Sequence, residues 1–195
     1  MKGFASIASS KQMKRTIVEM PNADAGVAAV CSFVPIANRA ARVLILGSMP
    51  GAASLLANRY YAHPPNAFWP IMGALFGAGP ALTYAKRMLV LKRAGVALWD
   101  VMASCVREGS LDSDIDEASI VPNDFLAFFK AHPGVTHVFF NGAKAEACFG
   151  RYVRPTLAGR RLKFTRLPST SPAHASLSLA QKVSAWRAVA EALKK

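Results

Sequence analysis

Residues 42–51 read RVLILGSMPG, and this stretch decides the fold class. After Arg42 comes a short run of branched apolar side chains, Val43–Leu46, that ends at Gly47, which is the pattern of a strand buried on both faces of a sheet. Three further runs of this kind follow at Gly95–Val101, Thr136–Asn141 and Leu162–Leu167. We therefore expect a mainly parallel sheet with both faces covered.

Helical patterns separate the four predicted strands. They lie at Phe68–Phe76, Leu82–Arg93, Phe125–His132, Ala143–Phe149 and Ser178–Lys195. Alternating strands and helices predict an α/β protein with helices on both faces of the sheet. The ligand site of such a sheet lies beyond the carboxyl ends of its strands, which draws attention to the loops at 47–69, 100–122, 141–144 and 168–176.

The composition predicts one folded, basic domain. The chain has 195 residues, 52% of them hydrophobic, and a net charge of +13 from 24 Lys and Arg against 11 Asp and Glu. Such a charge favours a polyanionic partner, and the apolar content excludes a disordered basic tail. We expect a poorly ordered basic leader at 1–30 and a single domain at 31–195. The leader has the composition of a transit peptide if the source is eukaryotic, and a misplaced start codon is the alternative.

Cofactors, metals and membranes are not indicated. Three scattered cysteines provide neither a disulfide framework nor a thiolate metal site, and the loops lack the glycine patterns of dinucleotide and nucleotide binders. The longest apolar runs are far shorter than the roughly 18–20 residues that cross a bilayer. Asp112, Asp114 and Asp116 resemble the start of a calcium loop, but Glu117 and Asn123 occupy its glycine and glutamate positions, so we expect a solvated acidic loop.

The loop after the first strand has the parts of a pocket for a flat, hydrogen-bonding ring. It combines a tight Gly/Pro turn, the aromatic pair Tyr60 and Tyr61, and Asn66 just before a helix. The alternative for Asn66 is that it only caps the helix, although capping and catalysis are compatible.

Hydroxyl groups and basic side chains gather near the fourth strand. Ser169, Thr170 and Ser171 follow it, and six Arg and Lys residues with no acid lie within residues 151–166. Hydroxyls and cations both bind phosphate, so we expect nucleic acid contacts here and a steep fall of affinity with salt. A solvated face is the ordinary alternative.

Together these motifs resemble a known family. The segments GSMPG (47–51), YYAHPPNAFW (60–69), GVALWDV (95–101), FFNGAKA (139–145) and LPSTSPAH (167–174) are similar to the hypoxanthine-DNA glycosylase branch of the uracil-DNA glycosylase superfamily. The resemblance implies a three-layer α/β/α fold around a four-stranded sheet. It covers roughly residue 33 to the C-terminus and excludes the leader.

The resemblance also implies roles for residues of the first loop. Met49 stands where mismatch-specific uracil glycosylases have the asparagine that orients water, and a thioether cannot do that work. This departure argues against uracil and moves the catalytic role to Asn66. Tyr61 matches the aromatic that stacks on the extruded base. Asp100, with groups near Ser48, would read the edge of the base, and the alternative for Asp100 is that it caps the loop after it.

Residues of the later motifs are assigned to DNA. Ser169 and Ala173 stand where uracil enzymes have a histidine and a wedge leucine, and Ser171 and His174 lie beside them. Lys144 begins a helix, which is a natural phosphate site. Arg160 and Arg161 complete the expected DNA contacts.

The implied activity is a monofunctional glycosylase, because no lysine stands in the catalytic motifs. It would flip a deaminated base, chiefly hypoxanthine, out of double-stranded DNA and hydrolyse its bond to the sugar. The alternatives are a uracil or xanthine glycosylase, a noncatalytic nucleic-acid-binding module, or an enzyme acting on small phosphorylated molecules. We expect a monomer that works in the cytoplasm, or in the nucleus or an organelle of a eukaryote.

Overall fold

The computed structural model describes residues 29–157 and 159–194, which contain a four-stranded parallel sheet in the order β3-β2-β6-β7. The strands are β2 (Val43–Gly47), β3 (Val96–Asp100), β6 (His137–Asn141) and β7 (Lys163–Leu167). Every residue of β2 and β3 is buried, as the continuous apolar runs require. The four predicted strands are confirmed.

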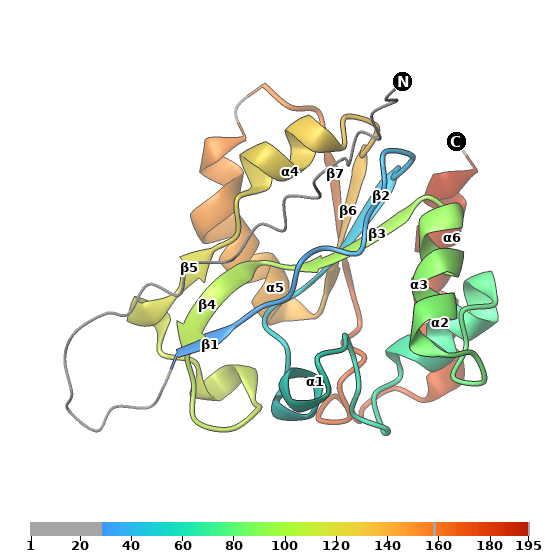
Figure 1. Cartoon of the computed structure of the whole chain (residues 1–195), viewed down its shortest axis with the longest axis horizontal. Helices are drawn as coiled ribbons and strands as arrows, with labels where there is room; N and C mark the ends of the chain where they lie inside the picture. The colour runs from blue at the N-terminus through green and yellow to red at the C-terminus, as the bar shows by residue number, and fades with distance from the viewer. Residues whose placement is uncertain (1–28, 158, 195) are drawn as a thin grey trace, which may run out of the picture.

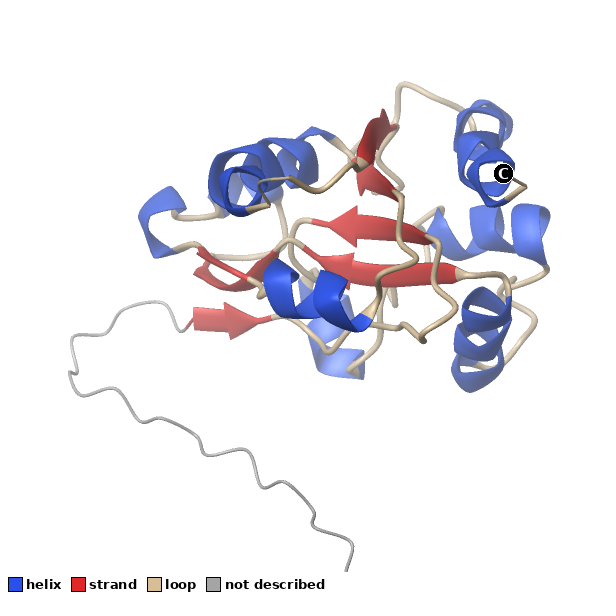
Figure 2. Cartoon of the chain, turned by 90° about the horizontal axis from the view of Figure 1, so that it is seen from above, coloured by secondary structure: helices blue, strands red, loops and turns tan. Residues whose placement is uncertain are grey.

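Helices cover both faces of this sheet (Figures 1 and 2). One face carries α2 (Phe68–Phe76), α3 (Tyr84–Arg93) and α6 (Leu179–Leu193), and the other carries α4 (Phe125–Ala131) and α5 (Ala143–Cys148). A π-helical turn at Phe149–Val153 and a 3-10 turn at Arg154–Thr156 continue α5. The three-layer α/β/α class is therefore confirmed.

A second, antiparallel sheet was not predicted. It consists of β1 (Ala29–Cys31), β4 (Met102–Val106) and β5 (Val121–Pro122) in the order β1-β4-β5. Strand β1 includes two residues of the expected leader, and the rest of that leader lies outside the described residues. Short strands paired across the chain carry little local signal, which is why the sequence did not reveal them.

The short helix α1 (Ala52–Ala57), in the loop at 47–69, was also not predicted from the sequence. Its N-terminus has no side-chain cap, so it lacks that local signal. The acidic loop contains two 3-10 turns, Asp112–Asp114 and Glu117–Ser119. Within the part of the chain that the structure describes, every helix is too short or too polar to span a lipid bilayer.

Helix α6 connects the hydrophobic core to the loop at 168–176, which follows β7. Trp186 is completely buried against Phe68 of α2, with ring centroids 5.9 Å apart, and its Nε1 donates a hydrogen bond to the carbonyl of Pro168 at 3.0 Å. Lys182 is 5% exposed and donates to the carbonyl of His174 at 2.8 Å. Removal from water lowers the pKa of Lys182. The 168–176 loop is thus held at both ends by one helix.

Candidate functional site

A pocket of about 630 Å³ opens beyond the carboxyl ends of the parallel strands. Figure 1 shows the loops after β2 and β7 meeting at this edge, next to α1. Nine residues predicted from the sequence line the pocket: Ser48, Met49, Tyr61, Asn66, Asp100, Ser169, Ser171, Ala173 and His174. The volume is in the range of about 300–1,000 Å³ that is usual for small-molecule sites.

The floor of the pocket depends on Gly47, which pairs with Asp100 in the register of β2 and β3. A Cβ atom at Gly47 would lie 2.5 Å from Oδ1 of Asp100 and 3.1 Å from the hydroxyl of Tyr61. Only glycine lets these two polar groups approach the strand end so closely. The glycine of the GSMPG motif is therefore required by the site itself.

Asp100 is a buried carboxyl group on this floor, only 3% exposed. Its Oδ2 accepts a hydrogen bond from Oγ of Ser32 at 3.2 Å. Burial, with the charge of Asp112, raises its pKa to about 7, against the lowering effect of the Ser32 and Tyr60 hydrogen bonds and of the Arg107 charge. Near neutral pH the group can accept a hydrogen bond when ionised or donate one when protonated.

Tyr61 forms an aromatic wall with a constrained backbone. Its ring stacks on Phe68 with centroids 4.0 Å apart and an interplanar angle of 18°. Its φ of 52° lies in the left-handed region, which costs a non-glycine residue about 1–2 kcal/mol. Strain of this kind is found where surrounding contacts impose a conformation at a site. Burial, and secondly the Asp100 charge, raise the pKa of its hydroxyl, which stays neutral.

Asn66 uses one of the two polar atoms of its side-chain amide in a hydrogen bond within the protein. Oδ1 accepts a hydrogen bond from the backbone N–H of Phe68, the first residue of α2, at 3.0 Å, whereas the N-cap itself is Ala67, which has no side-chain cap. Among the described residues none accepts a hydrogen bond from Nδ2. This contact holds the side chain at the start of α2 while Nδ2 remains available at the pocket, so it is compatible with the catalytic role predicted from the sequence.

Asn141 and Thr170 form a clamp that the sequence did not reveal. Nδ2 of Asn141 donates to the hydroxyl of Tyr61 and to Oγ1 of Thr170, both at 2.9 Å, and its Oδ1 accepts from the backbone N–H of Thr170 at 2.8 Å. The carbonyl of Thr170 accepts from the backbone N–H of Ala67 at 2.9 Å. The Asn141 side chain does not cap α5, whose N-cap is Gly142 at a φ of 97°.

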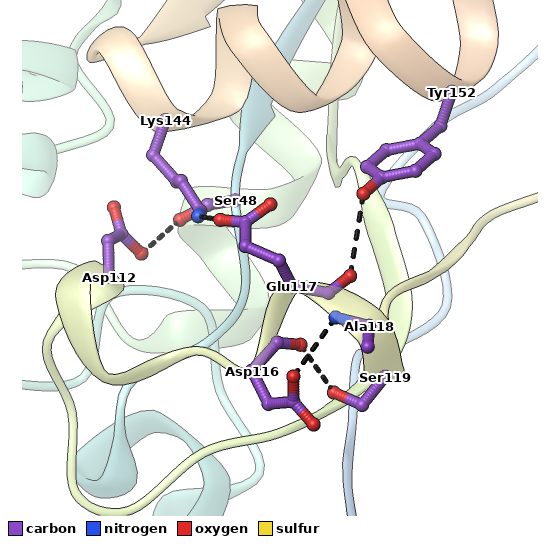
Figure 3. Close-up of polar contacts among 8 residues, drawn as sticks. All are labelled: Ser48, Asp112, Asp116, Glu117, Ala118, Ser119, Lys144 and Tyr152. Carbon is purple, nitrogen blue, oxygen red and sulfur yellow. Dashed lines mark hydrogen bonds and ion pairs between the residues drawn. The ribbon is translucent and has the colours of Figure 1, made fainter.

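The acidic loop is exposed to solvent as expected, and residues 110–113 of it also form one wall of the pocket. Arg107 Nη2 donates to the carbonyl of Pro50 at 2.7 Å, and the backbone N–H of Ala52 donates to Oγ of Ser110 at 3.0 Å. Ser48 Oγ donates to Oδ1 of Asp112 at 2.7 Å (Figure 3). These contacts bring Asp112 into the lining, a position for which its spacing in the sequence carried no signal.

Three predicted DNA contacts do not reach the pocket. Lys144 forms an ion pair with Glu117, drawn in Figure 3. Arg160 lies over the ring of Phe129, 4.9 Å from its centroid, and lines a second pocket of about 300 Å³. Arg160 and Arg161 precede the amino end of β7, whereas the main pocket lies beyond its carboxyl end. The strand therefore separates them from the site, although they are near it in sequence.

Fold and site together define an α/β protein whose pocket, at the ends of a parallel sheet, presents an aromatic ring, an amide and two carboxyl groups. The described residues contain no cluster of three or more His, Cys, Asp or Glu side chains that could hold a metal ion. Such a pocket suits a planar ring with polar edges.

The chain belongs to the uracil DNA glycosylase superfamily, whose sequence model matches residues 34–192. It is 35% identical over 164 residues to a protein of Methanosarcina barkeri named hypoxanthine DNA glycosylase, covering 84% of this chain and 97% of that protein. A protein of the same name from Methanosarcina acetivorans is 35% identical over 158 residues, covering 80% and 95%. The family inferred from the motifs is confirmed.

A solved structure agrees with the fold. The solution NMR structure of a proposed uracil DNA glycosylase from Methanosarcina acetivorans matches with a TM-score of 0.71 and 32% identity, covering 86% of this chain and all of that chain.

Proposed function

We propose that this protein is a monofunctional DNA glycosylase that removes hypoxanthine from deoxyinosine in double-stranded DNA and leaves an abasic site. The observation that carries the proposal is the convergence of Asn66, Tyr61 and Asp100 on one pocket in which Met49 offers no polar group. The names of the two Methanosarcina relatives support hypoxanthine as the base. DNA as substrate places the enzyme in the cytoplasm of a prokaryote, or in a nucleus or organelle.

Access to the base requires that the nucleotide leave the duplex. Flipping costs a few kcal/mol, and less for a base that is already mismatched, as hypoxanthine is opposite thymine. Phe68 occupies one face of the Tyr61 ring, so the flipped base stacks on the face toward the pocket. Ionised Asp100 then accepts a hydrogen bond from N1–H of hypoxanthine.

Asn66 positions the attacking water through its available Nδ2. An amide is not a strong base, but breaking the bond to C1′ gives the sugar positive character, so a weakly activated water can attack. Groups that donate to the departing base stabilise its negative charge. Among the described residues no lysine lines the pocket, which supports hydrolysis without a Schiff base.

Contacts with the DNA come from the 168–176 loop. Ser169 and Ser171 offer hydroxyls to phosphate. Ala173 and His174 lie at the edge of the pocket, where the DNA double helix is opened. Nothing in this arrangement needs a second copy of the chain, so we propose that the enzyme acts as a monomer.

The test of the activity is strand cleavage of end-labelled duplexes that contain a single deoxyinosine, deoxyuridine or deoxyxanthosine, with and without hot alkali. We expect alkali-dependent cleavage at inosine. Cleavage at uracil alone would reject the proposed substrate, and no cleavage at any of the three would favour a noncatalytic binding module.

The role of Asn66 is tested by Asn66→Ser and Asn66→Ala under single-turnover conditions. Serine can still accept the hydrogen bond from the backbone N–H of Phe68, whereas alanine cannot, and both remove the amide that holds water. We expect both variants to excise hypoxanthine about 100-fold or more slowly, with the melting temperature of Asn66→Ser close to that of the parent. Undiminished excision by folded Asn66→Ser would refute this role.

A further inference from the structure

The pocket of the proposed glycosylase holds a carboxylate that the mechanism above does not use. Asp112 lines the pocket, and the hydrogen bonds of the 110–113 wall to Ser48 and Ala52 hold it there. Ser48 binds Oδ1 of Asp112, whereas no described residue donates a hydrogen bond to Oδ2. One oxygen is therefore anchored and the other is available.

The proposed hydrolysis lacks a proton acceptor. Water loses a proton when its oxygen bonds to C1′, and neither the Asn66 amide nor the Met49 thioether takes up protons readily. Asp100 is nearly completely buried and bound to Ser32 at the floor, where it faces the base. Asp112 is an exposed carboxylate on the pocket wall, so a water molecule can reach it.

The lining also contains His63 and His174, which are the other side chains able to accept a proton there. His174 belongs to the loop assigned to the DNA backbone, and its Nε2 lies 3.5 Å from Oγ of Ser176. His63 is exposed, and no described residue forms a hydrogen bond with its side chain that would orient it. The Ser48 contact distinguishes Asp112, because it orients the carboxylate from the loop that follows β2.

Charge provides an independent argument. A carboxylate on this wall repels the phosphates of the proposed substrate, and four other acids lie within residues 108–117 of an otherwise basic protein. The same negative charge is useful where a sugar becomes positively charged during bond cleavage. Its location in the pocket therefore suits catalysis better than DNA binding.

We propose that Asp112 is a second catalytic residue, which accepts the proton of the attacking water and stabilises the positive sugar. This inference rests on the proposed function. The water oxygen bonds to C1′ as the C1′–N9 bond breaks, the bonding electron pair leaves with hypoxanthine, and Oδ2 takes the water proton. The departing base is protonated by solvent, and Asp112 later returns its proton to solvent.

The experiment compares Asp112→Asn, Asp112→Ala and Asp114→Asn with the parent in single-turnover excision from an inosine duplex. Asp114 belongs to the same 3-10 turn and is exposed, but it does not line the pocket, so Asp114→Asn is the matched control. We expect both Asp112 variants to be about 100-fold slower, the usual scale for a lost acid–base group. Their DNA affinity should be equal or higher, and the control should be unchanged.

Rescue of the excision rate by sodium formate distinguishes a catalytic role of Asp112 from a structural one, because the loss of a merely structural residue would not respond to formate. Formate should restore a measurable part of the rate of Asp112→Ala by replacing the missing carboxylate, and should not restore Asn66→Ala. A rate within threefold of the parent in Asp112→Asn would overturn the proposal, and so would a loss that formate does not repair. Failure of the parent to excise hypoxanthine would instead reject the proposed function.

Discussion

Asp100 connects the stability of the protein to pH. Its pKa is raised from 3.8 to about 7, so between those values the folded protein holds a proton that the unfolded chain releases. The free energy of unfolding must then fall as pH rises from about 4 to about 7. Asp100→Asn removes this dependence and can still accept the Ser32 hydrogen bond. We expect it to exceed the parent in stability by on the order of a few kcal/mol at pH 8, and little at pH 4.

Urea unfolding of parent and Asp100→Asn at several pH values measures this difference. Asp114→Asn, an exposed acid outside the pocket, serves as the control and should change the pH dependence little. An equal difference between Asp100→Asn and the parent at pH 4 and pH 8 would contradict the titration of Asp100 in this range.

At the scale of the elements, one buried threonine joins the end of β6 to the start of α2. Thr170 is 1% exposed, and its hydroxyl and backbone N–H both pair with Asn141 while its carbonyl pairs with Ala67. The start of α2 also carries Asn66, so the position of the proposed catalytic amide depends on a contact between two loops.

Thr170→Val keeps the shape and the backbone contacts of this residue but removes one of the two acceptors of Nδ2 of Asn141 and leaves the Tyr61 hydroxyl as the other. A buried polar group that loses one partner costs about 1–3 kcal/mol, so we expect the free energy of unfolding to fall by that amount. Thr165→Val on the exposed face of β7 is the matched control and should be nearly neutral. Urea unfolding checks both, and equal effects would argue against the clamp.

At the scale of the molecule, the chain carries a net charge of +13, but its basic residues are not all located at the pocket. The pocket lies beyond the carboxyl ends of the sheet, and Arg160 and Arg161 lie before the amino end of β7. DNA that enters the pocket then meets these arginines only if it extends around the edge of the sheet. Long-range attraction remains, but it is screened beyond about 10 Å at 0.1 M salt.

We expect affinity for an inosine duplex to fall steeply with salt, because each phosphate contact releases counterions. The double substitution of Arg160 and Arg161 by alanine should leave the slope of log affinity against log salt unchanged. Fluorescence anisotropy titrations between about 50 and 200 mM salt measure it. A slope shallower by about 0.9 for each arginine would show that they contact phosphate after all.

The sequence by itself determined the four parallel strands, five of the helices (α2 to α6) and nine lining residues of the pocket. The physical reason is that these are local signals. Buried parallel strands require continuous apolar runs, and the loops that follow them must meet at one edge of the sheet, which is why residues of the GSMPG and LPSTSPAH motifs line the same pocket.

Only the tertiary structure decided which distant side chains meet. Ser48 and Asp112 are 64 residues apart, Asn141 and Thr170 are 29 apart, and the paired residues of β1 and β4 are 73 to 77 apart. No spacing rule links such pairs, because their contact follows from how the loops pack. The direction of β7 likewise places Arg160 and Arg161 at the opposite end of that strand from the site. Their nearness in sequence to the 168–176 loop had suggested that they lie at the site.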